Sequence, residues 1–183
     1  MNESKIIPVL SSFILFFSLF IFSQSNLAQN DNNQSKRDKS ISAAREIMSS
    51  TSFCGLVTMG DHCQPHIRTM EPFAPDENMV IWFGTNSNSR KVEDINNNSE
   101  VAIFYNDPTG NGYVVYYGIA KLINSPEEKS KYWKDEWKQY YPDKEKDASY
   151  ILIKVLPKQI DVINYKQGIY GDSESWRAET VNF

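Results

Sequence analysis

The sequence EVAIFYNDPTGNGYVVYYGIAKLI, residues Glu100–Ile123, carries the clearest signal for the fold of this chain. Its two ends, Glu100–Asn106 and Tyr113–Ile123, are rich in valine, isoleucine and aromatic residues, whereas the segment between them is dense in asparagine, aspartate, proline and glycine. β-Branched and aromatic residues favour extended strands, and the intervening residue types favour turns. The stretch therefore predicts two strands of an antiparallel sheet, joined by a turn.

Four further strands are predicted outside this pair: Phe53–Met59, Gln64–Phe73, Asn78–Gly84 and Tyr150–Asn164. The first two flank a turn at Gly60 and predict a hairpin. Pro157 marks a bend or an edge within the last strand, because proline cannot donate to a sheet ladder. Six strands joined mostly by hairpins predict an antiparallel barrel of the α+β class that is mainly β.

Three helices are predicted to flank the barrel: Ile41–Ser49, Ser89–Asn96 and Ser125–Tyr140. The first has apolar side chains at helical spacing and Ser40 as its cap. The third begins with Ser125 at the cap and Pro126 at the first helical position. Trp133 and Trp137 stand four residues apart in it, and this spacing predicts that both pack against the barrel.

The first 28 residues are predicted to be a secretory signal peptide. Ile6–Phe22 is almost wholly apolar and is followed by a polar segment with small residues, as expected before a cleavage site. An uncleaved membrane anchor is the alternative, because the apolar run is near the lower length limit for spanning a bilayer. The protein is therefore expected to be periplasmic or extracellular, with membrane contact only if the leader stays uncleaved.

The segment after the leader, Gln29–Lys39, has no apolar side chain and is predicted to be a disordered linker. This leaves residues 40–183 as one folded domain. The whole chain has 183 residues, with 19 Lys and Arg against 23 Asp and Glu, a net charge of −4 and a pI of about 5.2. This balance excludes a polycation built for nucleic acid, so no nucleic-acid partner is expected. Two cysteines are too few for a disulfide scaffold.

The segment Trp82–Lys91, WFGTNSNSRK, is predicted to bind a phosphate group. A strand ends there and a helix begins, with two cations, Arg90 and Lys91, in the first helical turn. Cations at this end oppose the helix dipole, but an anion held between them by backbone N–H groups and by the Thr85 and Ser89 hydroxyls reverses that penalty. The alternative, which these residues alone leave equally open, is a polar surface loop with two solvated basic residues.

The same segment resembles the flavin-phosphate motif of the pyridoxamine 5′-phosphate oxidase-like family, in which F-x-T-N precedes S-R-K. Three other segments resemble strands of that family in the same order: Gln64–Met70, Ser99–Tyr105 and Tyr117–Lys121. The resemblance covers residues 43 to about 163. The tryptophan-rich helix and the segments that follow it resemble the general stress protein type of this family.

The resemblance implies a six-stranded antiparallel split β-barrel with flanking helices, which forms a homodimer and binds one FMN at each of two sites in the interface. It implies that Arg68 lies beside the flavin, reaching its phosphate or ring edge, and that Met70 offers backbone near the ring. The residues implied to hold the phosphate are Thr85, Ser89, Arg90 and Lys91.

The sequence also departs from true pyridoxamine phosphate oxidases. Ile160–Asn164 contains no tryptophan, and no Arg-Leu pair follows it, so a phosphorylated B6 vitamer is not the expected substrate. The expected function is an exported FMN-binding flavoprotein, an oxidoreductase of a small redox substrate, with the chemistry residing in the flavin. The alternatives are a non-catalytic flavin-binding or stress-protective module, and a split barrel that binds haem or the deazaflavin F420.

Cysteine and histidine residues crowd the first predicted hairpin. A metal site at Cys63 and His66 is not expected, because their spacing on a strand puts them on opposite faces. A disulfide between Cys54 and Cys63 stays open, since an oxidising compartment favours it while the hairpin register places Cys63 opposite about Thr58. His66 shares a face with Arg68, so it either lines the flavin cavity or is a packed or exposed histidine.

Overall fold

The computed structural model describes residues 31–183, so the predicted signal peptide, residues 1–28, lies outside the described residues. The chain divides into two units, residues 1–39 and 40–183. In the first unit, residues 31–39 are helical and mostly exposed, whereas the sequence predicted a linker without secondary structure. A hydrogen bond of 2.8 Å from Gln34 Nε2 to Asp38 Oδ1, one helical turn apart, supports the helical conformation. No helix within residues 31–183 is long and apolar enough to cross a membrane.

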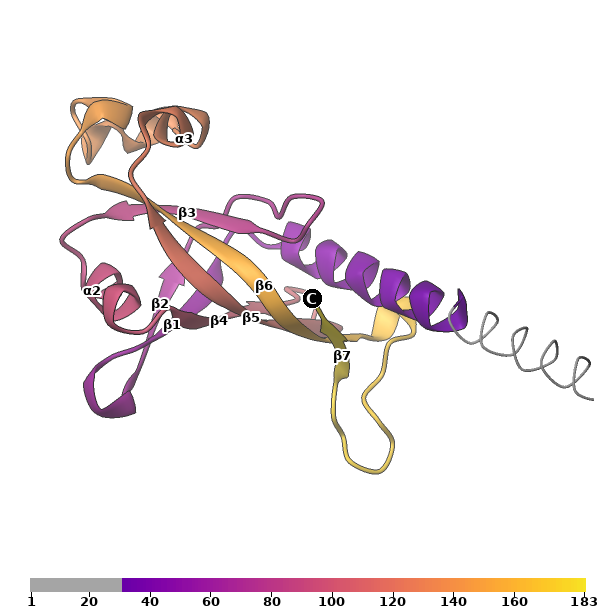
Figure 1. The fold of residues 1–183 in the computed structure, drawn as a ribbon. Helices are drawn as coiled ribbons and strands as arrows, with labels where there is room; N and C mark the ends of the chain where they lie inside the picture. The colour runs from indigo at the N-terminus through magenta and orange to yellow at the C-terminus, as the bar shows by residue number, and fades with distance from the viewer. Residues whose placement is uncertain (1–30) are drawn as a thin grey trace, which may run out of the picture. The chain divides into compact units, whose positions relative to one another are not determined.

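The second unit is a curled antiparallel sheet with helices beside it (Figure 1). Its strands are β1 (Cys54–Met59), β2 (Pro65–Met70), β3 (Ile81–Asn86), β4 (Glu100–Asn106), β5 (Gly112–Ile123), β6 (Tyr150–Asn164) and β7 (Glu179–Asn182). They are ordered β2-β1-β4-β5-β6-β3, with β7 paired to β6, and β2 and β3 are the outer strands. The predicted six-stranded antiparallel sheet is confirmed, and the short β7 is an addition to it.

The longest strand, β6, pairs with two strands along the same edge. Residues 150–155 pair with β3, and residues 159–162 pair with β7. Pro157 lies between these two segments and opposite Gly118 of β5, where the register of the β5–β6 ladder shifts. A proline has no backbone N–H to donate. It is tolerated at this position because neither β3 nor β7 pairs with β6 there. The sequence predicted a bend or an edge at Pro157, and the structure shows a register shift there and no strand paired with it on the second edge.

The strand predicted from Asn78 begins later, at Ile81. The carboxylate of Asp76 accepts hydrogen bonds of 2.9 Å from the backbone nitrogens of Asn78 and Val80, which closes a turn. Met79 sits inside this turn with a φ of 63°, in the left-handed region. The local side-chain bonds of Asp76 therefore compete successfully with the strand ladder over these residues.

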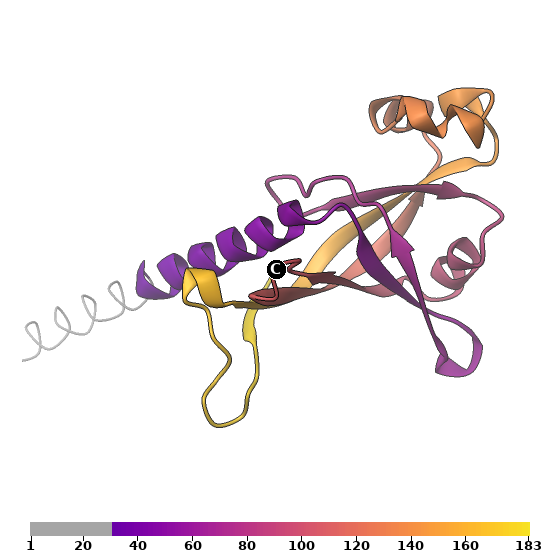
Figure 2. The same ribbon diagram turned by 180° about the vertical axis from the view of Figure 1, so that it is seen from behind.

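Helix α2 (Arg90–Asn97) confirms the predicted helix after the phosphate motif, and α3 (Pro126–Lys131) begins as predicted, with the Ser125 hydroxyl accepting from Glu128 N at 3.4 Å. The prediction that α3 continues to Tyr140 is wrong. The helix ends at Lys131, and a short 3-10 helix, η2 (Asp135–Gln139), follows it. Both views place α2 at the end of the sheet that carries the β1–β2 hairpin (Figures 1 and 2).

Aromatic packing explains the break after α3. Tyr132 stacks on Trp82 at 4.4 Å between ring centroids, while the next residue, Trp133, meets Tyr150 at 5.5 Å. Consecutive side chains of a helix diverge by about 100°, so an unbroken helix does not turn both rings onto the same sheet. Trp133 and Trp137 do contact each other, at 6.2 Å, as their spacing predicted.

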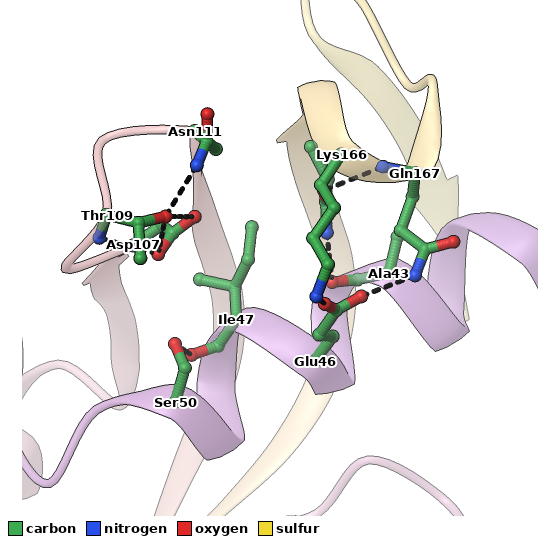
Figure 3. A network of polar contacts seen from close by, with 10 residues as sticks. Ala43, Glu46, Ile47, Ser50, Asp107, Thr109, Asn111, Lys166 and Gln167 are labelled. Atoms are coloured by element: carbon green, nitrogen blue, oxygen red, sulfur yellow. Dashed lines mark hydrogen bonds and ion pairs between the residues drawn. The ribbon is translucent and has the colours of Figure 1, made fainter.

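Residues 40–50 are helical, as predicted for Ile41–Ser49, but Ser40 lies inside the run of helical residues and is not its cap. These residues are attached to the barrel by polar contacts (Figure 3). The carboxylate of Glu46 accepts hydrogen bonds from Lys166 Nζ and Gln167 Nε2. The buried Asn164 donates from Nδ2 to the backbone oxygen of Ala43 at 3.2 Å. The stripe predicted from the spacing packs in the main core: Ala44, Ile47 and Met48 are buried in it, and Ile41 is partly buried against it. Ala43, which the spacing did not include, is buried as well.

Both cysteines in the hairpin are free thiols, with Cys54 buried and Cys63 exposed. The register of the hairpin pairs Cys54 with Met70 and Thr58 with His66, which keeps the two cysteines at opposite ends of β1. The disulfide that the sequence left open is therefore not formed. Burial raises the pKa of the Cys54 thiol to about 12, so this group is inert at neutral pH.

Tyr116 connects the sheet to the turn that precedes β3. Its side chain is fully buried, and its hydroxyl lies 3.0 Å from Met79 O and 3.1 Å from Val155 O. Replacing Tyr116 with phenylalanine should lower the free energy of unfolding by about 1–2 kcal/mol, because a buried carbonyl group loses its donor. Chemical denaturation measures this loss. Tyr140→Phe, at a position 67% exposed outside the sheet, is the matched control and should change stability by less than about 0.5 kcal/mol.

Candidate anion and cofactor site

The loop between β3 and α2 is built by Asn86. Its side-chain oxygen accepts from Asn88 N at 2.8 Å, and its backbone oxygen accepts from Ser89 N and from the Ser89 hydroxyl. Ser89 occupies the cap position of α2 as predicted, but its hydroxyl is turned to Asn86 and makes no capping bond. No side chain of the described residues caps the first turn of α2, which leaves backbone N–H groups available to an anion.

Three cations gather beside this turn. Lys91 on α2 is half-buried and donates from Nζ to the buried Thr85 hydroxyl at 3.0 Å. Loss of hydration and the nearby charge of Arg68 lower the pKa of Lys91. Loss of hydration also lowers the pKa of Arg68, with the charge of Arg90 acting in the same direction. Each cation therefore destabilises its neighbour, and a bound anion relieves that repulsion.

Arg68 reaches this cluster from β2. Its Nη1 donates to the Thr58 hydroxyl at 2.7 Å and to Leu56 O at 3.3 Å, both on β1. Its Nη2 lies 3.4 Å from the carboxylate of Asp94 on α2. Residues alternate along β2 between exposed and half-buried, so that His66, Arg68 and Met70 share one face as the sequence predicted. The structure thus brings Arg68 together with Thr85, Arg90 and Lys91.

Met70 and Ser89 have smaller parts in this arrangement. The Met70 side chain packs against the main core, and its backbone oxygen accepts from Cys54 Sγ at 3.6 Å. Ser89 lies at the start of α2 with its hydroxyl already bonded to Asn86. The Ser89 hydroxyl donates its one proton to Asn86 O, so it has to turn away before it can donate to a phosphate. The contacts of Met70 neither add to nor oppose the role that the resemblance gives it.

Sequence reasoning missed Asp94. It is 5% exposed on α2, and its Oδ2 accepts from the Thr58 hydroxyl and lies 3.0 Å from His66 Nδ1. Burial by itself raises the pKa of Asp94, but the hydrogen bonds from Thr58 and His66, with the charges of His66 and Arg68, outweigh burial and lower it. The available signal was an acidic residue placed between Val92 and Ile95, the predicted buried face of the helix.

The donor set fits a phosphate group. Arg68, Arg90 and Lys91 supply three positive charges and Asp94 one negative charge, which leaves two net positive charges among these four side chains. A fully ionised phosphomonoester carries two negative charges. Charge-assisted donors and uncapped N–H groups of a helix are the groups that bind such an anion when water is excluded. The residues at this end of the antiparallel barrel are therefore suited to an anion such as a phosphate group.

Comparison with known proteins identifies the family. The family model described as pyridoxamine 5′-phosphate oxidase like matches residues 39–169. General stress protein 26 of Bacillus subtilis is 30% identical over 104 residues, which are 55% of this chain and 72% of that protein. The chain belongs to the pyridoxamine 5′-phosphate oxidase-like family, and its resemblance to the general stress proteins is confirmed.

Solved structures confirm the split-barrel fold. General stress protein 26 of Bacillus anthracis str. Sterne superposes with a TM-score of 0.62 at 23% identity, over 78% of this chain and 97% of that chain. A pyridoxamine 5′-phosphate oxidase-related, FMN-binding protein of Nostoc punctiforme gives 0.56 at 14% identity, over 79% and 93%. A structure described as an F420 reductase gives 0.51 at 20% identity, over 63% and 94%. At these identities the likeness shows the fold alone.

Proposed function

We propose that this chain is an exported flavoprotein that binds FMN and acts as an oxidoreductase on a small redox substrate. The observation that carries the proposal is the cluster of Arg68, Arg90 and Lys91 beside the uncapped first turn of α2, in which Arg68 and Lys91 are half-buried and Arg90 is exposed. Family membership and the FMN-binding neighbour support a flavin as the source of the phosphate. The apolar leader in the sequence supports export.

In this proposal the phosphate of FMN is bound by Arg68, Arg90 and Lys91, with the Thr85 hydroxyl and the N–H groups of α2. The Ser89 hydroxyl joins them by turning away from Asn86. When bound, FMN supplies the transfer of a hydride or of electrons. Lys91 and Thr85 are already joined by a hydrogen bond, so the two donors are oriented before the ligand arrives. Met70 contributes backbone near the ring, and the protein contributes binding, orientation and the exclusion of water.

The proposal predicts the result of a flavin titration. Purified residues 29–183 should take up FMN with a Kd of about 1 μM or lower, seen as a shift of the flavin absorbance bands and a change in flavin fluorescence. Riboflavin, which lacks the phosphate, should bind at least tenfold more weakly. A protein that is indifferent to FMN contradicts the proposal. Uptake of F420 in its place supports the second candidate, which the F420 reductase among the structural neighbours favours.

Turnover separates an oxidoreductase from a non-catalytic flavin-binding module. Reduction of bound FMN by NADH or NADPH under anaerobic conditions, followed by reoxidation by an added acceptor over many cycles, supports an enzyme. A bound flavin that no such reductant reduces supports a module that sequesters FMN. Bleaching of the flavin absorbance band measures both steps.

A homodimer is part of the proposal. The registers of β2-β1-β4-β5 align Ile67, Val57, Ala102 and Tyr117 in one row across the outer face of the sheet. Ile67 is 69% exposed and Phe104, in the next row, is 41% exposed. Beside them is a hollow of about 310 Å³ lined partly by Val57 and Tyr117. Contiguous exposed apolar side chains on one face are typical of a protein–protein interface.

A further inference from the structure

All described hydrogen bonds between side chains of β2 and side chains of α2 are made to one atom, Asp94 Oδ2. His66 Nδ1 and Arg68 Nη2, both on β2, lie 3.0 Å and 3.4 Å from Asp94 Oδ2. The same oxygen accepts from the Thr58 hydroxyl, which in turn accepts from Arg68 Nη1 at 2.7 Å. Asp94 therefore connects the cation that comes from β2 to the helix that carries Arg90 and Lys91.

A carboxylate at this place requires an explanation. Beside a phosphate, a negative charge repels the ligand, and the repulsion is stronger where water is excluded. Asp94 is 5% exposed, so it also carries the cost of burying a charge. Its contacts offset that cost, since every hydrogen bond described for its side chain comes from a residue on β1 or β2.

We propose that Asp94 is a positioning residue of the anion site, whose carboxylate holds the Arg68 guanidinium and the His66 ring against α2 so that Arg68 faces a bound phosphate. The proposal rests on the proposed function for the identity of the phosphate. It assigns to His66 a proton on Nδ1, because the facing carboxylate oxygen accepts that proton.

The glycine at the end of β1 supports this assignment. A Cβ atom at Gly60 would lie 2.3 Å from His66 Cε1 and 2.8 Å from His66 Nδ1, so only glycine leaves room for the ring where it meets Asp94. The φ of Gly60 is −85°, which alanine adopts without strain. Gly60→Ala therefore moves the His66 ring and alters neither a charge nor the backbone.

The experiment compares Asp94→Asn with Glu93→Gln. Both variants remove one negative charge from the same helix, but Glu93 is exposed and has no described contact with Arg68 or His66. If Asp94 positions Arg68, Asp94→Asn should weaken FMN binding at least tenfold, although the loss of a negative charge by itself favours an anion. Glu93→Gln should leave the Kd within threefold or lower it. Riboflavin affinity should be unchanged in both variants, because the effect is on the phosphate.

The two explanations of Asp94 predict opposite changes in the Kd for FMN when Asp94 is replaced by asparagine. Tighter FMN binding by Asp94→Asn shows that the carboxylate only repels the ligand, and overturns the proposal. An unchanged Kd overturns it as well. If wild-type protein takes up no FMN, the proposed function fails instead, and the two failures are thereby distinguished. Circular dichroism establishes that each variant is folded. If Asp94→Asn does not fold, Gly60→Ala replaces it and should weaken FMN binding about threefold, and an unchanged Kd in that variant overturns the proposal.

A second readout does not depend on flavin. The chain has two histidines, His62 and His66, so nitrogen NMR of labelled protein resolves both rings. The neutral His66 ring should be in the Nδ1–H form in the wild type and should shift toward the Nε2–H form in Asp94→Asn and Gly60→Ala. His62 has no described contact with Asp94 and serves as the internal control. A His66 tautomer that stays the same in both variants contradicts the positioning role.

Discussion

Joint replacement of Arg90 and Lys91 by alanine should weaken FMN binding at least tenfold. Each residue offers a charge-assisted hydrogen bond worth about 1.5–3 kcal/mol, and about 1.4 kcal/mol corresponds to a factor of ten in Kd. Equilibrium titration followed by flavin fluorescence measures the change. Lys144→Ala with Lys146→Ala is the matched control, because it removes the same charge from two exposed lysines that have no described contact with Arg68, Thr85 or Lys91.

The same double variant should not be less stable than wild type when no ligand is bound. The pKa of Lys91 is lowered by loss of hydration and by Arg68, so the folded protein disfavours the charged form of this lysine. Removing the charge therefore relieves a strain in the ligand-free protein, and its melting temperature should stay the same or rise. Lower FMN affinity combined with lower stability points instead to a structural role for the pair, and an unchanged affinity discards the phosphate assignment.

Placing a charge on the outer face of the sheet should convert the proposed dimer into a monomer and release its FMN. Phe104 lies on β4 within the apolar face and is 41% exposed. In Phe104→Glu a buried interface would hold an unpaired carboxylate, and this cost is large enough to separate the subunits. Light scattering after size-exclusion chromatography measures the mass, and flavin absorbance measures the cofactor content.

Tyr140→Glu is the control for this experiment. Tyr140 is 67% exposed and lies after η2, outside the sheet, so its variant should remain a dimer with wild-type FMN content. A Phe104→Glu protein that stays dimeric contradicts the proposed interface. A monomer that binds FMN with wild-type affinity keeps the phosphate site and contradicts its location between subunits.

The six long strands were predictable because each signals itself locally. β4, β5 and β6 carry runs of β-branched and aromatic residues that are bounded by turn formers, and their observed bounds agree with the prediction to within one residue. β7 has four residues, too few for such a pattern to emerge from the surrounding sequence. The break after α3 was not predictable from the chain segment itself, because it depends on where the rings of Trp82 and Tyr150 lie.

The candidate site divides in the same way. Thr85, Arg90 and Lys91 lie within one short segment, where a strand ends and a helix begins, so a local sequence motif was enough to predict them. Arg68 was found through the family resemblance. The contact between Asp94 and His66 joins positions 28 residues apart, and it exists only because the curled sheet brings β2 beside α2. Periodicity along one helix shows which face is buried but not which polar group meets it.

The two outer strands of the sheet, β2 and β3, are not paired with each other. Arg68 comes from one of them and Thr85 from the other, so in the proposed holoprotein the ligand joins two edges that backbone hydrogen bonds leave separate. A ligand present at a hundred times its Kd adds about 2.7 kcal/mol to the free energy of unfolding. Amide hydrogen exchange in β2 should therefore slow when FMN is bound, and a protease should cut the ligand-free chain first at this edge. If the chain is exported as proposed, loading of the cofactor would thus set how long it survives among extracytoplasmic proteases.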